Sequence, residues 1–452
     1  MFLEEEENVK VQYNHVSSIA LAIVLSAGLA PASAQSVGVY RGAAGAKDAS
    51  MASAGSVLGT TPVAALSWNP AGLASLDQPE VDIALAALSA RGTFANRVDS
   101  NGLLRDAQGV VPDGAVAFPL QHGRFVVAGG LLADGAIAGS WQYRDVPGAA
   151  GATYGLATHR SGVIVLRPTA GLGARLGSRV SVGGSVSMLW NHNELSSPYI
   201  FQTQAPLVGL KTMLDVEASG TGWSASLGAV VKPAKTFSAA VSWRSSTTLT
   251  TKGQATGDAW AQFAAAGIAA DSKFEYSAAV RNSFPSMVAA AAEWQATPRV
   301  QISGQLERWG WRDAFSSLPI TLTNGSNAAI NGLVGSNRIV EEVPLDWKNQ
   351  LVSRAGVEFA WRPAVTLRGG YSYGPSPVPT DTLTPMTAAI VEHTLGFGVG
   401  LLQGATRVDV GYQWSPTTKR QVQDTALQGS EYDNTSVSVG VQGFVLSVSR
   451  RF

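Results

Sequence analysis

Apolar and polar residues alternate along much of the chain. In residues 180–190 every second residue is valine, glycine, methionine or tryptophan, and the residues between them are mostly serine and glycine. Residues 300–306 and 408–414 show the same period, with glutamine, serine or aspartate on the polar face. A period of two places successive side chains on opposite faces of a β-strand. The pattern therefore predicts strands with one apolar face, as in a wall with lipid outside and a polar lumen inside.

A soluble β-sandwich alternates in the same way, but other features favour a membrane barrel. Short turns, as at residues 232–235, alternate with long polar segments, as at residues 312–346. A tilted strand of roughly ten residues crosses the apolar band, so the chain from residue 80 onward accommodates about fourteen strands. Aromatic residues, which settle at membrane interfaces, lie at or near the predicted strand ends: Trp190, Trp243, Trp294, Trp309, Trp361, Tyr373 and Trp414. We predict an all-β fold, a transmembrane antiparallel β-barrel.

The two ends of the chain indicate export to the outer membrane of a Gram-negative bacterium. Residues 18–30 form an apolar run with the length of a signal-peptide core, and Ala32-Ser33-Ala34 resembles a cleavage site. We predict a signal peptide over residues 1–34, although the four glutamates at residues 4–7 are atypical of its first region. The chain closes on an alternating stretch whose last residue is Phe452, as outer-membrane barrels do.

Residues 35–79 lack sustained alternation. They are rich in alanine, glycine and serine, and prolines at positions 62, 70 and 79 break any long element. Small, weakly polar residues suit a compact plug inside a lumen, and a disordered periplasmic tail is the alternative. We predict three parts: a signal peptide over 1–34, an N-terminal hatch over 35–79 and the barrel over 80–452.

Composition narrows the class of protein further. Charged residues make up 14% of the chain, against roughly 25% in soluble globular proteins. The net charge of zero argues against a nucleic-acid surface. The absence of cysteine excludes disulfides and thiolate metal sites. After residue 34 no stretch approaches the roughly 18 apolar residues of a membrane helix, so we expect the mature chain to cross a membrane with strands.

Several short motifs occur in the same order as in a known family. They are Asn69-Pro70-Ala71-Gly72, Lys232-Pro233, Val241-Ser242-Trp243-Arg244-Ser245, Phe284-Pro285, Leu306-Glu307-Arg308-Trp309-Gly310-Trp311, Asp346-Trp347-Lys348, Leu367-Arg368-Gly369-Gly370-Tyr371 and Ser376-Pro377-Val378-Pro379. The ordered set resembles the FadL-like outer-membrane transporters of long-chain fatty acids, which include channels for toluene and other aromatic hydrocarbons. The resemblance implies fourteen strands and an N-terminal hatch, with Asn69, Pro70 and Ala71 as the hatch motif.

The resemblance also implies passive passage of a ligand that leaves sideways through a gap made by a kinked strand. A lateral exit keeps the ligand out of water, where each exposed CH₂ costs about 0.8 kcal/mol. Glycines and bulges allow a strand to bend. The candidates are Gly129-Gly130 and Asp134-Gly135, although an ordinary lumen-facing glycine pair is the alternative, and residues 132–136 match the family only loosely.

Arginines on the polar faces are candidate ligand contacts. The alternation turns Arg354 and Arg368 inward, and a carboxylate ligand would need such a cation. Paired charges that simply fill a lumen are the alternative. Arg450 departs from the pattern, because the alternation would place an apolar residue there. It should lie near an interface, since arginine at the midplane of a bilayer costs about 2–4 kcal/mol.

We find no sign of catalysis. Gly370-Tyr371-Ser372-Tyr373-Gly374 has the spacing of a nucleophile elbow, but it lies in a predicted strand with no helix after it. We therefore predict a channel for passive uptake of hydrophobic molecules, either fatty acids or hydrocarbons, and not an enzyme. The alternative is a structural or adhesive barrel with a plugged lumen and partner-binding loops.

We expect the protein to act as a monomer without cofactor or metal and without nucleic acid as a partner. Its surroundings would be outer-membrane lipid and lipopolysaccharide, and the barrel-assembly machinery would insert it. The hydrophobic small molecule is then its one expected ligand.

Overall fold

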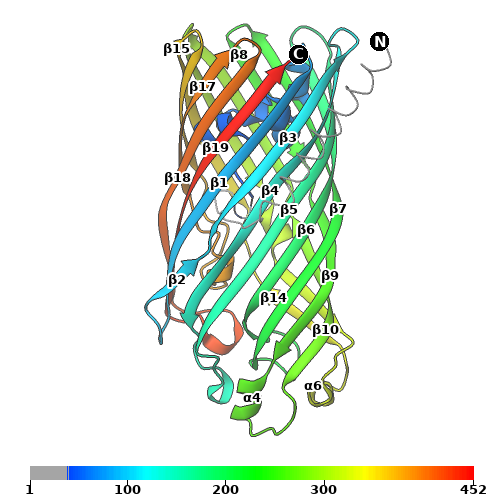
Figure 1. Cartoon of the computed structure of the whole chain (residues 1–452), viewed down its shortest axis with the longest axis vertical. Coiled ribbons are helices and arrows are strands. Elements are labelled where there is room, and N and C mark those ends of the chain that lie inside the picture. Colours follow the sequence, from blue (N-terminus) through cyan, green and yellow to red (C-terminus); the bar gives the residue numbers. More distant parts are fainter. Residues whose placement is uncertain (1–37, 39) are drawn as a thin grey trace, which may run out of the picture.

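The computed structural model describes Gly38 and residues 40–452, which form an antiparallel β-barrel (Figure 1). The predicted signal peptide and the first residues of the predicted hatch lie outside the described residues. The strands are β1 (Glu80–Ala95), β2 (Gly102–Arg105), β3 (Gln108–Leu120), β4 (Phe125–Arg144), β5 (Leu156–Arg175), β6 (Val180–Ile200), β7 (Lys211–Ala234), β8 (Phe237–Arg244), β9 (Thr247–Asp258), β10 (Lys273–Phe284), β11 (Met287–Thr297), β12 (Val300–Trp309), β13 (Ser317–Thr323), β14 (Ile339–Pro344), β15 (Gln350–Arg362), β16 (Val365–Tyr373), β17 (His393–Gln403), β18 (Thr406–Val422) and β19 (Thr435–Arg451).

The wall is a closed barrel of 14 strands, as the sequence predicts. Five of these strands are each interrupted once, so that β2 and β3, β8 and β9, β10 and β11, β12 and β13, and β14 and β15 lie in line. The barrel closes where β1 pairs with β19 in an antiparallel register from Glu80 opposite Arg451 to Ala95 opposite Ser436. Closure pairs the first strand with the last, so neither keeps the long free edge that a membrane does not tolerate.

The two ends of the barrel differ in the length of their connections. Turns of two to four residues join β3 to β4, β5 to β6 and β7 to β8 at the end where the C-terminus lies (Figure 1). At the other end the connections are long, as at residues 374–392 between β16 and β17. Outer-membrane barrels have short periplasmic turns and long extracellular loops. The end with the C-terminus is therefore the periplasmic end.

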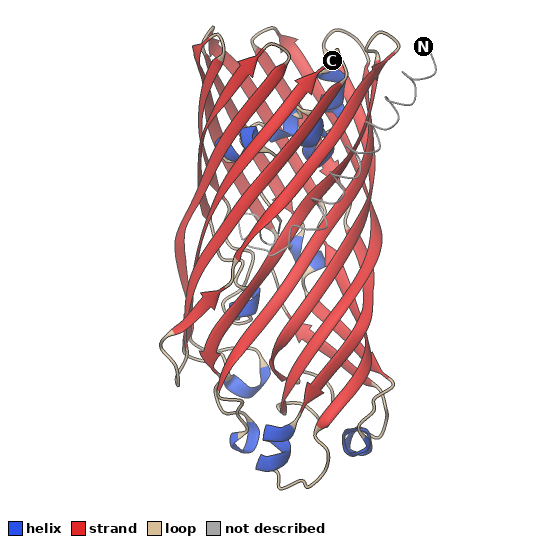
Figure 2. Ribbon diagram, viewed as in Figure 1, coloured by secondary structure: helices blue, strands red, loops and turns tan. Residues whose placement is uncertain are grey.

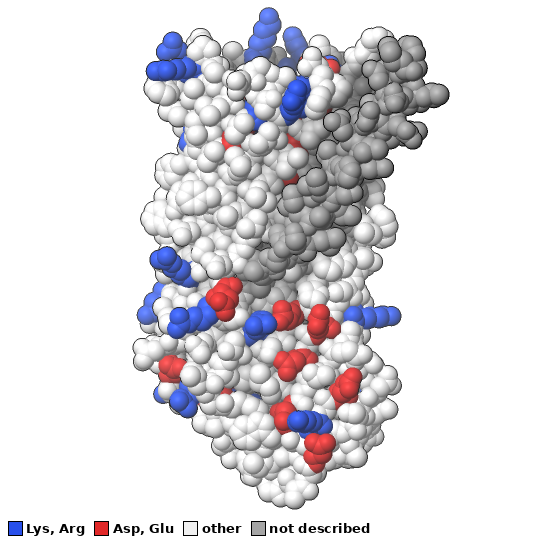
Figure 3. Space-filling model, viewed as in Figure 1, with Lys and Arg blue, Asp and Glu red and all other residues white. Residues whose placement is uncertain are grey.

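The outer surface carries an apolar belt. Figure 3 shows a broad band with few charged side chains, bounded on the loop side by acidic and basic residues. Exposed apolar side chains cover this band on all sides, among them Leu85, Phe118, Leu172, Val186, Trp223, Val288, Leu306, Leu351, Leu367, Phe397, Val410 and Phe444. Arg450 is exposed near the periplasmic end of β19, with its guanidinium 5.4 Å from the centre of the Phe452 ring. This position near the margin of the belt agrees with its expected place at an interface.

Short helices lie inside the barrel and in its loops (Figure 2). Those before β1 are α2 (Ala46–Ser50), η1 (Ser56–Leu58), α3 (Pro62–Trp68) and η2 (Pro70–Ser75), and the others are η3 (Ala149–Gly151), α4 (Trp260–Ala265), α5 (Trp311–Ala314), α6 (Ala328–Val334), η4 (Pro385–Thr387) and η5 (Gln428–Ser430). Within the described part of the chain, no helix is long and apolar enough to cross a membrane.

Candidate functional site

Residues 40–76, which we call the plug, lie inside the periplasmic half of the lumen. The helix α2 packs against β17, β18 and β19, and η2 packs against β5, β6 and β7 on the other side. Small residues allow this close fit. A Cβ atom at Gly370 of β16 would collide with the backbone of Met51, and one at Gly183 of β6 would collide with Pro70. The plug is therefore packed against the wall on several sides of the lumen.

Asn69 connects the plug to the wall. Its amide oxygen accepts the backbone N–H of Ala71 at 3.0 Å and so begins η2. Its amide nitrogen donates to the carbonyl oxygens of Val57 at 2.8 Å, Ala229 at 3.3 Å and Val241 at 3.2 Å. The side chain thus joins two parts of the plug to β7 and β8. Pro70 and Ala71 follow it in the first turn of η2, and the gating role of this motif stays a prediction.

Arg354 and Arg368 belong to ion pairs between the wall strands. The guanidinium of Arg354 lies 3.2 Å from Glu307 and donates to the carbonyl oxygen of Ala52 in the plug at 2.8 Å. Arg368 donates to Glu358 at 2.6 Å and to Asp409 at 2.8 Å. All four contacts are buried. Arg354 thus joins the wall to the plug, whereas Arg368 joins neighbouring wall strands. Their role as ligand contacts stays a prediction.

The same network includes the serine of the candidate nucleophile motif. Ser372 lies within β16 and accepts a hydrogen bond from Arg354 at 3.1 Å. The residues after β16 form an irregular segment, and no helix directly follows the motif in this described region. A nucleophile elbow needs a strand-to-helix turn, so Ser372 lacks that setting.

The wall contains a break in its hydrogen-bond ladder between β3 and β4, which we call the first opening. Pairing of the two strands stops where Gly114 faces Leu131 and resumes where Arg105 of β2 faces Ser140. Residues 106–113 and 132–139 are therefore unpaired with each other. Pro112 lies on one edge and has no N–H to donate, which suits an unpaired edge.

The predicted kink residues lie in and beside this opening. Gly129 and Gly130 pair regularly with β3 and β5 on the periplasmic side of the first opening. Asp134 lies within the opening, at a shift of register between β4 and β5 that falls between Ala133 and Gly135. The irregularity in this strand thus lies at the Asp134-Gly135 candidate. The role of all four residues in an exit stays a prediction.

The start of the plug occupies the first opening from inside. Tyr40 forms an isolated antiparallel bridge with Gly135, and the N–H of Arg41 donates to the carbonyl oxygen of Asp134 at 2.8 Å. The guanidinium of Arg41 pairs with Asp113 on the opposite edge. Asp113 also accepts the N–H of Ala133 at 3.0 Å. Plug residues and one carboxylate thus replace the missing ladder.

Two more arginines surround the same place. Arg167 of β5 donates to Asp134 at 2.8 Å, and Arg244 of β8 lies 3.5 Å from the other oxygen of that carboxylate. Arg244 also donates to the carbonyl oxygen of Ser67 in the plug. Removing one partner of a buried pair leaves an uncompensated charge and costs about 3–5 kcal/mol. The charges therefore hold the plug in the first opening.

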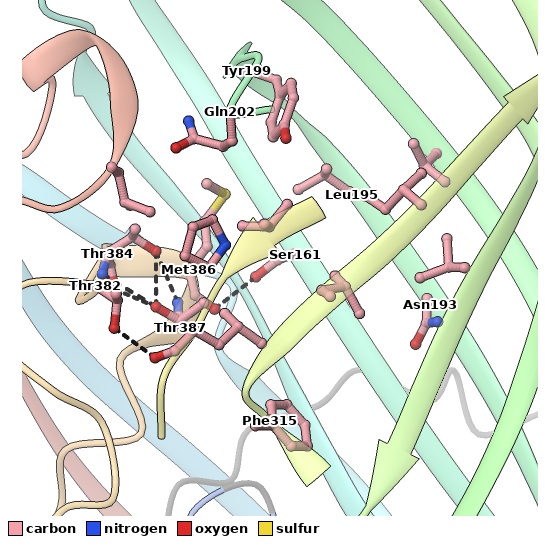
Figure 4. A pocket seen from close by; sticks show the side chains of 18 of the residues that line it. Ser161, Asn193, Leu195, Tyr199, Gln202, Phe315, Thr382, Thr384, Met386 and Thr387 are labelled. Atoms are coloured by element: carbon pink, nitrogen blue, oxygen red, sulfur yellow. Dashed lines mark hydrogen bonds between the residues drawn. The ribbon is translucent and has the colours of Figure 1, made fainter. Parts of the chain in front are cut away.

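A cavity of about 250 Å³ lies on the extracellular side of the plug. Its wall includes residues of β5, β6, β10, β13 and β14, together with the inward-folded segment around η4 and the loop around η5. Figure 4 shows Phe315 at one margin and Tyr199 and Gln202 at another. The lining is mainly apolar, and no lysine or arginine occurs among the described residues that form it.

The polar side chains of the lining bond to the protein itself. Ser161 donates to the carbonyl oxygen of Met386 at 3.2 Å, and Thr382 donates to that of Leu345 at 2.6 Å (Figure 4). Tyr199 donates to Glu341 at 2.8 Å. Groups bonded in this way have little capacity left for a ligand. The cavity therefore presents itself to a ligand as an apolar surface.

Glu431 lines the cavity from the loop between β18 and β19. Burial raises the pKa of its carboxyl group to about 7, and Lys211 opposes this shift from 3.0 Å away. The same ammonium group lies 3.0 Å from Asp145 in the loop after β4. Lys211 thus joins two loops at the extracellular end of the cavity.

A series of aromatic rings leads from the cavity to the first opening. Phe315 stacks on Trp347 at 4.7 Å between ring centres, and Trp347 lies 5.2 Å from Trp311. Tyr40 lies 5.8 Å from Trp311 and 5.0 Å from Trp309. We call these five residues the aromatic series. They form a continuous apolar contact from the cavity lining to the residue that bridges Gly135.

Sequence reasoning missed the residues that fill the first opening. Tyr40, Arg41 and Asp113 carry no motif, and they meet only because the plug folds back against β3 and β4. Pro112 inside an otherwise regular strand was the available signal, since proline within a sheet marks an edge or a bulge. Pro112 points to β3, the strand before β4, which carries the candidate glycines Gly129, Gly130 and Gly135.

A closed barrel with an apolar belt, a plugged lumen and an apolar cavity defines an outer-membrane transport protein. The sequence matches the model of the outer membrane protein transport protein family (OMPP1/FadL/TodX) over residues 23–452. The chain belongs to this family, whose members transport hydrophobic compounds across the outer membrane of Gram-negative bacteria.

Solved structures of the same fold support this assignment. A FadL homologue from Pseudomonas aeruginosa has a TM-score of 0.72 at 15% identity, covering 92% of this chain and all of that one. The toluene transporter TbuX from Ralstonia pickettii has a TM-score of 0.70 at 16% identity, covering 90% of this chain and 98% of its own. The toluene transporter TodX from Pseudomonas putida has a TM-score of 0.69 at 17% identity, covering 94% of this chain and all of its own. The search of curated proteins found no match.

Proposed function

We propose that this protein is a passive channel for neutral hydrophobic molecules, with small aromatic hydrocarbons as the best-fitting class, and that it releases them sideways through the first opening. The observation that carries the proposal is the aromatic series, which connects an apolar cavity to a break in the wall. Two of the similar structures are toluene transporters by name, which agrees with this class.

The lining of the cavity favours a neutral ligand over a fatty-acid anion. A carboxylate placed there would meet no lysine or arginine among the described lining residues, and an ion without a partner in an apolar site is strongly disfavoured. The volume of about 250 Å³ exceeds the roughly 150 Å³ of an engineered cavity that binds benzene. One substituted aromatic ring therefore fits without rearrangement of the wall. Arg354 and Arg368 would then act as structural charges.

The plug supplies the gate of the proposed channel. Asn69 fixes the later part of the plug to β7 and β8, whereas Tyr40 and Arg41 contact the first opening itself. Movement of the first plug residues would uncover Gly135 and connect the aromatic series to the lipid. Release into lipid avoids the cost of about 0.8 kcal/mol for each CH₂ exposed to water. The channel needs no catalytic group, cofactor or partner chain for this route.

The test is uptake by the purified protein in lipid vesicles and in cells without another hydrophobe channel. We expect toluene to enter faster than in protein-free controls, and little or no effect on uptake of oleate. Failure to accumulate any arene or alkane, together with failure to support growth on oleate, would favour the structural or adhesive barrel instead. Selective uptake of oleate would contradict the proposed substrate class.

A variant at Asn69 tests the hatch motif. Changing Asn69 to alanine removes the hydrogen bonds to Val57, Ala229 and Val241. Uptake should change while the barrel stays folded, as judged by heat-modifiable migration in gels. Unchanged uptake would show that the motif has no part in gating.

A further inference from the structure

The wall has a second break in its ladder, on the side away from the first opening. Pairing of β11 with β12 ends where Met287 faces Trp309, and pairing of β10 with β13 begins only where Val280 faces Ile320. Residues 281–286 and 310–319 thus form no regular ladder with each other. Among these described residues, one backbone hydrogen bond joins the two edges, from the N–H of Gly310 to the oxygen of Ser286. We call this break the second opening.

The sequence accounts for this break. Pro285 lies on one edge and Pro319 on the other, and neither has an N–H to donate. Between β12 and β13 the chain turns once as α5 instead of continuing as a strand. The inward side chain of this turn is Trp311, which is fully buried, while Arg312 and Asp313 are exposed. One helical turn therefore covers the second opening.

The cavity reaches both edges of the second opening. Asn282 and Phe284 line it from β10, and Phe315 and Leu318 line it from the connection to β13 and from β13 itself. On the opposite side the cavity meets β5 and β6, whose ladder is continuous there, as where Glu194 faces Gly162. The cavity thus lies directly behind a part of its surrounding wall that lacks a ladder.

The second opening lies at the outer margin of the apolar belt. On the periplasmic side of the second opening, Val288 of β11 and Leu306 of β12 are exposed. Toward the extracellular side follow the exposed arginines Arg308, Arg312 and Arg281. Arginine is tolerated near a membrane interface and not at its midplane. The second opening therefore faces the boundary between the outer leaflet and its headgroups.

We propose that the second opening is a lateral entrance through which a neutral hydrophobe already dissolved in the outer leaflet reaches the cavity. This inference rests on the proposed function and adds its entrance. Hydrophobic molecules concentrate in the membrane and not in water, because each buried CH₂ gains about 0.8 kcal/mol. A side entrance draws on that concentrated pool, whereas an entrance along the barrel axis draws on the dilute aqueous one. Displacement of α5 then admits the ligand between Phe284 and Leu318.

The natural absence of cysteine provides a direct test. Ser283→Cys and Leu318→Cys each place one thiol on an edge of the second opening. Val186→Cys is the matched control, since Val186 is exposed on the outer face of β6, is paired on both sides and does not line the cavity. Each protein, reconstituted in lipid vesicles, is modified with a bulky methanethiosulfonate reagent, and initial uptake of toluene is measured before modification, after it and after reduction.

We expect modification at positions 283 and 318 to lower the initial rate at least about fivefold, a change of about 1 kcal/mol in barrier, and reduction to restore it. Modification at position 186 should leave the rate unchanged. Equal rates for all three modified proteins would overturn the lateral entrance. If the unmodified proteins carry no toluene beyond protein-free vesicles, the proposed function itself fails, so the two failures are distinguishable.

Discussion

The two openings of this barrel share a cause and differ in position and in what closes them. Both arise where a proline interrupts a ladder, at Pro112 for the first and at Pro285 and Pro319 for the second. The first opening lies within the apolar belt and is closed by ion pairs and plug residues. The second lies at the outer margin of the belt and is covered by one helical turn around Trp311.

This difference fits two different tasks. Opening the first break requires the separation of the buried pair between Arg41 and Asp113, which is costly in a low-dielectric interior. Moving α5 separates mainly aromatic contacts, each worth about 0.5–1.5 kcal/mol beyond its buried area. The comparison predicts a slow, controlled exit into the bilayer core and a faster entrance from the interface. Four experiments test this distinction.

The largest effect should come from locking the first opening. Tyr40 and Gly135 face each other in an antiparallel bridge, where Cβ atoms lie about 4.5–5.5 Å apart, near the range that a disulfide needs. The oxidised Tyr40→Cys/Gly135→Cys protein should show uptake no higher than protein-free vesicles, and reduction should restore it. Tyr40→Cys alone is the control.

The locked protein also separates the two openings. Because the second opening stays free, the oxidised variant should still bind toluene in the cavity, as measured by quenching of tryptophan fluorescence. Full uptake despite complete crosslinking would show that release does not pass between Tyr40 and Gly135.

The next largest effect should come from Asp113→Asn, which leaves the guanidinium of Arg41 buried without its carboxylate. The loss of about 3–5 kcal/mol for a broken buried pair should free the first plug residues. A cysteine at the buried position Ala43 should then react with a thiol reagent at least about tenfold faster, since 1.4 kcal/mol already corresponds to that factor. Asp145→Asn breaks the buried pair with Lys211 at the far end of the cavity and should not change this rate. Equal acceleration by both changes would contradict a local role for Asp113.

The sequence predicts the wall better than it predicts either opening. Alternation identifies the strands, as at residues 180–190 of β6, because each inward or outward side chain depends only on its own strand. The openings depend on which strands are neighbours and in what register. The glycine marks Asp134-Gly135 as a candidate, but Asp113 on the facing edge lies on a different strand, and Arg41 reaches both edges only through the fold of the plug.

The same limit applies to the lumen charges. Alternation places Arg354 and Arg368 inside, but only the register of β12, β15 and β16 brings them to Glu307 and Glu358. The aromatic series likewise joins residues from two interrupted strands and the plug. Features that depend on one strand are readable from the sequence, and features that depend on contacts between distant strands are not.

A smaller, pH-dependent effect concerns the loop of residues 423–434. The pKa of Glu431 is raised by burial to about 7 from its ordinary 4.5, against the opposing effect of Lys211. The docked loop therefore holds the proton more tightly than the free loop does. Docking should be strongest below pH 4.5 and should weaken as the pH rises through about 7, by up to about 3 kcal/mol. Hydrogen-exchange protection of this loop should fall accordingly, and Glu431→Gln should remove the dependence.

Uptake over the same pH range then compares the lateral entrance with an axial one. If ligand enters through the second opening, a looser loop at high pH should leave the initial rate of toluene uptake unchanged. A rate that rises with pH in the native protein and stays constant in Glu431→Gln would place the entrance at the loop instead.

The smallest effect should come from the arginines around the second opening. Arg281→Gln and Arg312→Gln remove exposed charges, and exposed charge contacts are worth about 0–1 kcal/mol. Because the proposed ligand is neutral, the initial rate of toluene uptake should change by no more than about twofold. A lost charge contact of about 1 kcal/mol would instead change the rate about fivefold. Leu318→Arg places a charge on the edge itself and should lower the rate far more. A strong loss from the two outer changes, with uptake of oleate lost in parallel, would mean that this opening attracts anions, and the contrast with the ionic first opening would disappear.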